Sequence, residues 1–380
     1  MTDPTKTKKQ EQKSTELTAR EERFIKFASV EYDGQVYMTP RDFLDAMIVQ
    51  EPRPRLKRKL LSERELENIR KAALDFKVDK KKLKEADKMF HSLQNNGIVS
   101  YIEYLFLFSF LINPKAERQI VFNMFDKNKD SYVDKQEYLE MEKIFGNVWK
   151  AKRGVSENRT SLTKDYVDDE TGLQRRHLVD TTLLIYFFGK DGKKLLTFEA
   201  FDEFISNLRT EVLEDEFYEF AKGMKTISPV DFIRALIRYS QQDTSDNNIF
   251  IKRVLEGVSE NIEITFEDFF NFCNFLIHLN DFSMAARMSV LLNKRLSEEV
   301  FRRIIRICVD SEVNPSVIHT AFVAFDDKGN GNMNYTEFIS VLRNRRNRLF
   351  KFHTRLTGLR AFKKCMREEI RKSTVKQKIA

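Results

Sequence analysis

Oxygen-bearing side chains recur at fixed intervals in the twelve residues 126–137. Positions 1, 3, 5, 9 and 12 offer side-chain oxygens and position 7 a backbone carbonyl; these residues are Asp126, Asn128, Asp130, Asp134, Glu137 and Tyr132. Ca²⁺ takes six to eight oxygen ligands, and this is the ligand spacing of an EF-hand loop. Position 6, which is usually glycine, is Ser131, so we expect backbone strain there. The spacing predicts a Ca²⁺ site; the competing interpretation is a solvated acidic loop with chance spacing.

A second stretch, residues 326–337, has the same length and a different set of side chains. Its oxygen donors would be Asp326, Asn330, Asn332, Asn334 and Glu337, with Gly331 at the turn position. Position 3 is Lys328, whose charge opposes a cation and whose side chain supplies no ligand. A water molecule could replace the missing oxygen if Lys328 swings outward. We expect any Ca²⁺ site here to be weaker than the one in loop 126–137.

A short pattern repeats along the chain: an apolar residue, a small polar residue, two variable residues, an acid and an aromatic residue. Full or partial copies start at residues 38, 99, 133, 196, 227, 264, 296 and 333. Each resembles the end of an EF-hand loop, with a strand residue, a helix cap and a core aromatic. Most copies have lost their metal ligands. The copy at Val99 keeps a single carboxylate, Glu103, and we interpret it as a structural hand.

The elements that must position these loops are helices. The chain has 380 residues with 33 Phe but only 12 Gly and 7 Pro, which favours packed helices over turn-rich β folds. We expect an all-α protein with two lobes of EF-hand units, several of them degenerate, and short β pairings between loops. The expected segments are a disordered basic N-terminus (1–20), an N-terminal lobe (21–147), a flexible linker (148–178), a C-terminal lobe (179–342) and a basic C-terminal helix and tail (343–380).

The formal net charge is +8 and is concentrated in basic runs. Such runs are usually solvated helix faces but can meet an acidic partner or an anionic lipid surface. In the C-terminal run the candidates for such contacts are Arg343, Arg345, Arg346 and Arg348. No nucleic-acid-binding signature accompanies the basic runs, so we expect no nucleic-acid partner.

The remaining chemistry-bearing residues do not form an enzyme signature. The five histidines share no motif with a nucleophile or a metal site, and no phosphate-binding loop is present. Cys273 and Cys308 have apolar helical surroundings, whereas Cys365 lies among charges and is the candidate for an intermolecular disulfide. The longest apolar run, Tyr104–Ile112, has nine residues and is too short to cross a bilayer. The first twenty residues show no readable targeting segment.

Four blocks of the sequence, residues 37–43, 97–106, 187–190 and 210–214, resemble the mitochondrial calcium uptake protein family. These proteins are EF-hand regulators of the mitochondrial calcium uniporter. The resemblance extends from about residue 20 to about residue 370 and is closer to the second and third paralogues than to the first.

The resemblance implies a Ca²⁺ sensor on the intermembrane-space side of the mitochondrial inner membrane. It implies two working hands, one in each lobe, and partners that include the pore and scaffold subunits of the uniporter. It further implies dimerisation with a paralogue or with itself, in which Cys365 would form the disulfide, and contacts of basic residues with an acidic pore mouth and anionic lipid. The alternative function is a calcium-insensitive scaffold or dimerisation partner.

Overall fold

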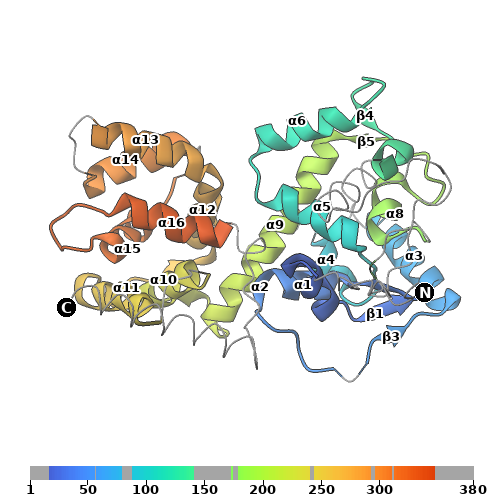
Figure 1. Ribbon diagram of the computed structural model, residues 1–380, viewed down its shortest axis with the longest axis horizontal. Coiled ribbons are helices and arrows are strands. Elements are labelled where there is room, and N and C mark those ends of the chain that lie inside the picture. Colours follow the sequence, from blue (N-terminus) through green and yellow to red (C-terminus); the bar gives the residue numbers. More distant parts are fainter. Residues whose placement is uncertain are drawn as a thin grey trace, which may run out of the picture.

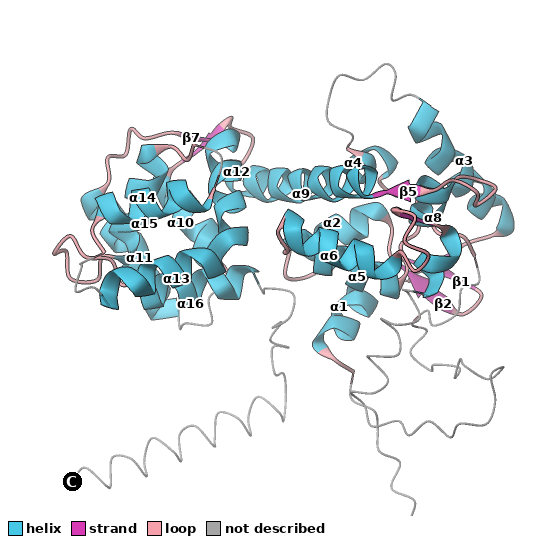
Figure 2. Ribbon diagram, turned by 90° about the horizontal axis from the view of Figure 1, so that it is seen from above, coloured by secondary structure: helices cyan, strands magenta, loops and turns pink. Residues whose placement is uncertain are grey.

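The computed structural model describes residues 17–55, 57–78, 88–140, 173, 179–239, 244–291, 296–309 and 312–346. They form two helical lobes joined by one long helix, α9 (Phe198–Ala221), as Figure 1 and Figure 2 show. The predicted all-α class with short β pairings between loops is confirmed.

The N-terminal lobe consists of the elements before α9 and the first half of α9. Its helices are α1 (Ala19–Phe27), α2 (Pro40–Ile48), α3 (Glu63–Val78), α4 (Met89–Leu93), α5 (Tyr101–Leu111), α6 (Lys115–Phe125) and α8 (Thr182–Phe188). Its strands are β1 (Val30–Tyr32), β2 (Gln35–Tyr37), β3 (Lys59–Leu60), β4 (Tyr132–Val133) and β5 (Leu196–Thr197).

Strands β1, β2 and β3 form a small sheet that sequence analysis did not anticipate. β1 and β2 are antiparallel and β3 lies parallel to β1. The turn between β1 and β2 is Asp33-Gly34, with φ of 47° and 73°. An Asp-Gly pair between two apolar segments is a strong hairpin signal, so this element could have been found from the sequence.

The C-terminal lobe consists of the second half of α9 and the elements that follow. Its helices are α10 (Pro229–Ile237), α11 (Thr244–Gly257), α12 (Phe266–Phe275), the 3-10 helix η2 (Leu276–His278), α13 (Leu279–Leu291), α14 (Glu298–Cys308), α15 (Pro315–Phe325) and α16 (Tyr335–Arg346). Its strands are β6 (Thr226–Ile227) and β7 (Ile264–Thr265).

The eight copies of the repeated pattern pair two by two through their apolar first residues. The antiparallel pairs are Met38 with Val99, Val133 with Leu196, and Ile227 with Ile264. In the fourth pair the Met333 N–H donates to the Leu296 carbonyl at 3.0 Å. The described residues therefore contain eight helix-loop-helix units in four pairs, two pairs in each lobe.

The other positions of the pattern also have their expected roles. At the small polar position the side-chain oxygen accepts the backbone N–H three residues later, which caps the following helix; these residues are Thr39, Ser100, Asp134, Thr197, Ser228, Thr265, Ser297 and Asn334. The aromatic residues are all at most 2% exposed: Phe43, Tyr104, Tyr138, Phe201, Phe232, Phe269, Phe301 and Phe338. One residue pattern therefore fixes the strand, the helix start and the core of every unit.

The two hydrophobic cores divide inside α9 and not at the expected linker. Val212 belongs to the N-terminal core and Leu213 to the C-terminal core. The expected boundary had placed residues 179–212 in the C-terminal lobe. The physical reason for the difference is that β5 pairs with β4, so α8 and the start of α9 must pack with the hand that contains loop 126–137.

Three expected segments lie largely outside the described residues: the N-terminus (1–20), the linker (148–178) and the basic C-terminal helix and tail (343–380), of which only residues 343–346 are described, in α16. α1 begins at Ala19 with a capping box between Thr18 and Glu21, so the expected disordered N-terminus overlaps an ordered helix start. The expected linker is described only at Leu173, which bridges Val36. In the part of the chain that the structure describes, no helix is long and apolar enough to cross a membrane.

Candidate calcium-binding loops

Loop 126–137 follows α6, and its backbone folds around the side chain of its first residue, Asp126. The Asp126 carboxylate accepts hydrogen bonds from the backbone N–H of Asp130 at 3.1 Å and of Ser131 at 2.8 Å. Asn128 Oδ1 accepts from the Asp130 N–H at 3.0 Å. The side chains at positions 1 and 3 therefore lie against the backbone of one tight turn.

The last residue of the loop reaches back to its beginning. Glu137 Oε1 accepts from the Lys127 N–H and Oε2 from the Asp134 N–H, both at 3.0 Å. Asp134 Oδ1 in turn accepts from the Glu137 N–H at 2.8 Å. Glu137 thereby joins position 2, ten residues earlier, to position 9.

Two non-glycine residues of this loop have left-handed backbone conformations. Lys129 has φ of 60° and Ser131 has φ of 69°. The turn that glycine normally makes is thus made by Ser131, as expected, at a cost of about 1 kcal/mol for a residue with a Cβ. The loop keeps its shape despite this strain.

The donor chemistry of loop 126–137 fits Ca²⁺. It offers four carboxylates, the Asn128 amide oxygen and the Tyr132 carbonyl, all hard oxygen donors. Across the described ranges no three His, Cys, Asp or Glu side chains already form a compact metal cluster. In this loop the carboxylates accept backbone hydrogen bonds instead. Ca²⁺ would therefore have to displace the N–H groups of Lys127 and Asp134, which now donate to the Glu137 carboxylate.

The loop is connected directly to the interlobe helix. Tyr132 pairs with Thr197, and Val133 pairs with Leu196. Thr197 is also the N-cap of α9, where its side chain accepts from the Ala200 N–H at 3.2 Å. A change in loop 126–137 therefore acts on the residue that starts α9.

Loop 326–337 makes the same turn with less strain. Asp326 accepts from the backbone N–H of Asn330 at 3.2 Å and of Gly331 at 2.8 Å. Gly331 has φ of 70°, which glycine adopts without steric cost. The backbone of this loop is better suited to the fold of an EF-hand than that of loop 126–137.

The side chains of loop 326–337 are less suited to a cation than those of loop 126–137. Lys328 is exposed at the position of a ligand. Asn332 Oδ1 accepts from the Leu296 N–H at 2.9 Å and so joins the paired units. Asn334 Oδ1 accepts from the Glu337 N–H at 3.3 Å as a helix cap. Only Asp326 and Glu337 bring negative charge to the expected ligand positions.

The hand that ends at Glu103 uses its one carboxylate for structure. Glu103 is fully buried and accepts from the Ser100 N–H at 2.8 Å and from the Thr181 hydroxyl. The Ile98 N–H donates to Thr182 Oγ1 at 2.8 Å. These contacts support the structural interpretation of this hand.

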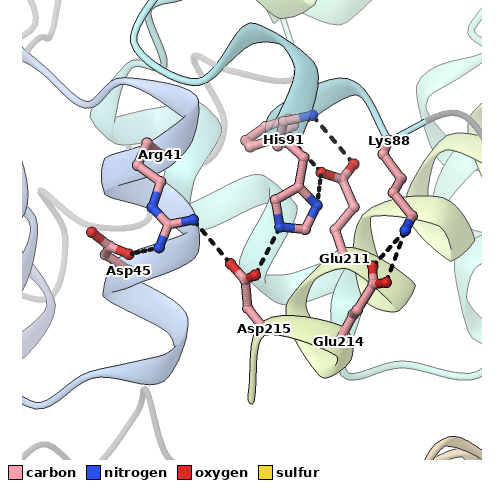
Figure 3. A network of polar contacts seen from close by, with 8 residues as sticks. Arg41, Asp45, Lys88, His91, Glu211, Glu214 and Asp215 are labelled. Atoms are coloured by element: carbon pink, nitrogen blue, oxygen red, sulfur yellow. Dashed lines mark hydrogen bonds and ion pairs between the residues drawn. The ribbon is translucent and has the colours of Figure 1, made fainter. Parts of the chain in front are cut away.

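A charged network attaches the N-terminal lobe to α9 (Figure 3). Its labelled members are Arg41, Asp45, Lys88, His91, Glu211, Glu214 and Asp215. His91 contacts Asp215 through Nε2 at 2.8 Å and Glu211 through Nδ1 at 3.2 Å. The hydrogen bonds to Asp215 and Glu211 raise the pKa of His91 to about 9. Glu211 is itself buried and also accepts from the backbone N–H groups of Phe90 and His91, at 3.2 and 2.6 Å.

This network explains why the block 210–214 is charged although it lies mid-helix. The acids of this block have no role in the prediction made from the sequence. Glu211 holds the start of α4, and Glu214 accepts from Lys88 Nζ at 2.8 Å. The signal that could have revealed this is two acids three residues apart on an otherwise apolar helix face.

The C-terminal arginines have different environments. Arg343 is exposed, so it stays a candidate for partner or lipid contact. Arg345 is 4% exposed and forms a bidentate ion pair with Glu216, at 2.9 and 2.8 Å. The proposal that Arg345 contacts a partner is therefore wrong, because its charge is buried between α16 and α9. Arg346 is partly buried. Arg348 lies outside the described residues.

The structure describes two of the three cysteines. Cys273 is buried and Cys308 is partly buried, as expected for residues of apolar helices. Burial raises the pKa of the Cys308 thiol. Cys365, the disulfide candidate, lies outside the described residues.

Known proteins resemble this chain in both sequence and structure. No protein-family model matches it. It is 33% identical to calcium uptake protein 3, mitochondrial, of Mus musculus over an alignment of 397 residues. This alignment covers 93% of this chain and 74% of that protein. It is 30% identical to calcium uptake protein 2, mitochondrial, of Mus musculus over an alignment of 353 residues. This alignment covers 93% of this chain and 78% of that protein.

Two solved structures share the fold over nearly the whole chain. The apo structure of the mitochondrial calcium uniporter protein MICU2 has a TM-score of 0.72 and 28% identity and covers 95% of this chain and 98% of its own. The crystal structure of EFHA2 in a Ca-binding state has a TM-score of 0.69 and 35% identity, with coverage of 85% and 98%.

Proposed function

The chain belongs to the mitochondrial calcium uptake protein family, and from this premise we propose that it senses Ca²⁺ and regulates Ca²⁺ uptake through the mitochondrial calcium uniporter. The observation that carries the proposal is loop 126–137, which has a full set of oxygen donors and a closed geometry between its first and last residues. A relative with 35% identity was crystallised in a Ca-binding state.

Ca²⁺ bound in loop 126–137 would supply a divalent charge that holds the loop carboxylates together. Glu137, whose carboxylate now accepts from the N–H groups of Lys127 and Asp134, would be the ligand that closes the loop around the ion. Glu137 lies in the helical residues 135–140 that follow the loop, so its reorientation would move this segment relative to α6. The β4–β5 pairing passes the change to Thr197 at the start of α9.

The second loop, residues 326–337, serves as a weaker Ca²⁺ site in this proposal. Asp326 and Glu337 supply the charge and Gly331 the turn, while Lys328 reduces affinity. Its exposed position leaves room for the Lys328 side chain to point to solvent.

The site of action in this proposal is the intermembrane-space side of the mitochondrial inner membrane. The partners are the pore and scaffold subunits of the uniporter, and a paralogue or a second copy with which the protein dimerises. Exposed Arg343 supports a contact with an acidic partner or anionic lipid. The role is regulatory and not enzymatic.

The test is a calorimetric Ca²⁺ titration of the wild-type chain beside Glu137→Gln and Glu337→Gln. Loss of the tighter site in Glu137→Gln and of a weaker site in Glu337→Gln would support the proposal. The matched controls are Glu140→Gln and Asp327→Asn, which remove exposed acids next to each site that are not ligands. A single site that survives Glu137→Gln would contradict the assignment of loop 126–137.

The alternative function is a calcium-insensitive scaffold, which the six degenerate hands favour. In that case Ca²⁺ would change neither the conformation nor the affinity for uniporter subunits. Pull-down of those subunits with wild-type protein and with Glu137→Gln, each with Ca²⁺ and with chelator, separates the two functions. Equal binding in all four samples would support the scaffold.

A further inference from the structure

An ion pair joins the end of loop 126–137 to the start of α8. Lys135 Nζ donates to Asp180 Oδ1 at 2.7 Å, and the two side chains are 27% and 31% exposed. Lys135 is the first of the helical residues 135–140, the segment that includes Glu137 and that we expect to move when Ca²⁺ binds. The pair therefore connects the segment that would move to a different helix.

The Lys135 side chain passes over the turn between α8 and β5. A Cβ atom placed on Gly192 of this turn would lie 2.9 Å from Lys135 Cδ, which is closer than an ordinary van der Waals contact. Gly192 has φ of 65°, a backbone conformation that favours glycine. The lysine chain is therefore packed against the backbone of this turn, so its path to Asp180 is fixed by packing as well as by charge.

The other end of the pair belongs to a well-anchored part of the lobe. Asp180 directly precedes Thr181, the N-cap of α8. The Thr181 hydroxyl donates to Glu103, whose side chain is fully buried. The start of α8 is thereby attached to the structural hand that ends at Glu103. Asp180 can thus act as a fixed point against which Lys135 is held.

We propose that the Lys135–Asp180 pair holds residues 135–140 in their Ca²⁺-free position and so lowers the Ca²⁺ affinity of loop 126–137. This proposal rests on the proposed function. Glu137 must turn toward the ion while Lys135, two residues earlier, is held by Asp180. Part of the binding free energy is then used to break or distort the pair. Lys135 and Asp180 are positioning residues and not Ca²⁺ ligands.

The competing explanation is that the pair acts on Ca²⁺ only through its charges. Removal of the Asp180 carboxylate would then weaken Ca²⁺ binding, because a nearby negative charge is lost and the positive charge of Lys135 is no longer balanced. If the pair restrains residues 135–140, the same change would tighten Ca²⁺ binding, because that segment can then move at lower cost. The two explanations therefore predict opposite signs for Asp180→Asn.

The test is a calorimetric Ca²⁺ titration of the wild-type chain, Asp180→Asn, Lys135→Met and the double variant at physiological ionic strength. We expect loop 126–137 of Asp180→Asn to bind Ca²⁺ about two- to fivefold more tightly, which is the worth of a partly exposed ion pair. In the Lys135→Met background the pair is already absent, so Asp180→Asn should bring no further gain. Equal or weaker binding in Asp180→Asn alone, or a further gain in the double variant, would overturn the proposal.

Amide hydrogen exchange in chelator measures the restraint without Ca²⁺. The backbone amides of residues 135–140 should exchange faster in Asp180→Asn than in the wild type, and at equal rates once Ca²⁺ is bound. The matched control is Asp191→Asn, which removes an exposed acid from the turn that contains Gly192 and keeps the ion pair. This control should leave both exchange and affinity unchanged.

The outcomes separate this proposal from the proposed function. A wild-type chain that binds Ca²⁺ at loop 126–137, with unchanged affinity and exchange in Asp180→Asn, would overturn this proposal alone. A wild-type chain without a Ca²⁺ site in that loop would overturn both.

Discussion

Loops 126–137 and 326–337 have the same turn and opposite weaknesses. In the first, Ser131 makes the left-handed turn at φ of 69°; in the second, Gly331 makes it at φ of 70°. In the first, four carboxylates occupy ligand positions, whereas the second has two and a lysine. One loop therefore has good donors on a strained backbone, and the other has poor donors on a relaxed one.

The comparison shows that turn geometry and ligand charge vary separately in these hands. Both loops hold their first aspartate by the same two N–H groups, at positions 5 and 6. The first aspartate therefore holds the turn in the same way in both loops, whatever the charge at the other positions. If EF-hand affinity depends mainly on the charge count, the strained loop should still be the tighter site.

The largest expected effect is that of Glu137→Gln. Loss of the only carboxylate that can bind with both oxygens should weaken the first site at least about 100-fold, or about 2.7 kcal/mol. Calorimetry should show one fewer tight site while circular dichroism shows unchanged helix content. Retention of the tight site would mean that loop 326–337 is the stronger of the two.

The converse change in the second loop is Lys328→Asp. Replacing a cation by a ligand should raise the affinity of loop 326–337 for Ca²⁺ about 10- to 100-fold, because repulsion becomes attraction and a ligand is gained. The neutral variant Lys328→Ala is the control and should give a smaller gain. If neither variant binds more tightly, ligand charge is not what limits this loop.

The lobes also differ in how they are attached to α9. Asp215 contacts His91 of the N-terminal lobe, whereas the next residue, Glu216, pairs with Arg345 of the C-terminal lobe. Only the first attachment titrates between pH 6.5 and about 9. The pKa of His91 is raised from 6.5 to about 9, so its stabilisation is complete below pH 6.5 and is lost as the pH rises through 9.

We therefore expect His91→Gln to lower the free energy of unfolding by about 1–2 kcal/mol at pH 6, after allowance for partial exposure, and by little at pH 10. Denaturant unfolding of both proteins at several pH values measures the difference. In Arg345→Gln the loss should be the same at both pH values, since the guanidinium stays protonated. A loss in His91→Gln that does not change with pH would mean that His91 acts through packing alone.

The smallest expected effect concerns the backbone. Ser131→Gly should relieve strain in the first loop and tighten Ca²⁺ binding by about 0.5–1 kcal/mol, roughly two- to fivefold. Gly331→Ser should weaken the second loop by a similar amount. If both changes leave affinity unaltered, the strain at position 6 is equal with and without the ion.

The sequence was sufficient to locate every hand because the repeated pattern performs local tasks. Met38, Val133 and Ile264 are strand residues wherever they pair, and Thr39 and Ser228 cap helices through neighbours three residues away. The family resemblance is also confirmed by relatives at 30–33% identity. The assignment of Ca²⁺ ligands in either loop stays a prediction.

The features that were missed depend on contacts between distant residues. The lobe boundary was misplaced because nothing local shows that Leu196 pairs with Val133. Arg345 looks like any other arginine of a basic run until Glu216, 129 residues earlier, is placed beside it. A pocket lined by Met47, Val212 and Leu276 likewise takes residues from both lobes, so no sequence window contains it.

Helix α9 has 24 residues and is at once the exiting helix of one hand and the entering helix of the next. With a rise of about 1.5 Å per residue it is roughly 36 Å long, so a tilt of about 5° at its first turn would displace its far end by about 3 Å. A displacement of that size exceeds the radius of a water molecule and is enough to break or form a side-chain contact in the other lobe. Helix α9 can thus act as a lever that carries a tilt at the strand pair of loop 126–137 into the core of the C-terminal lobe.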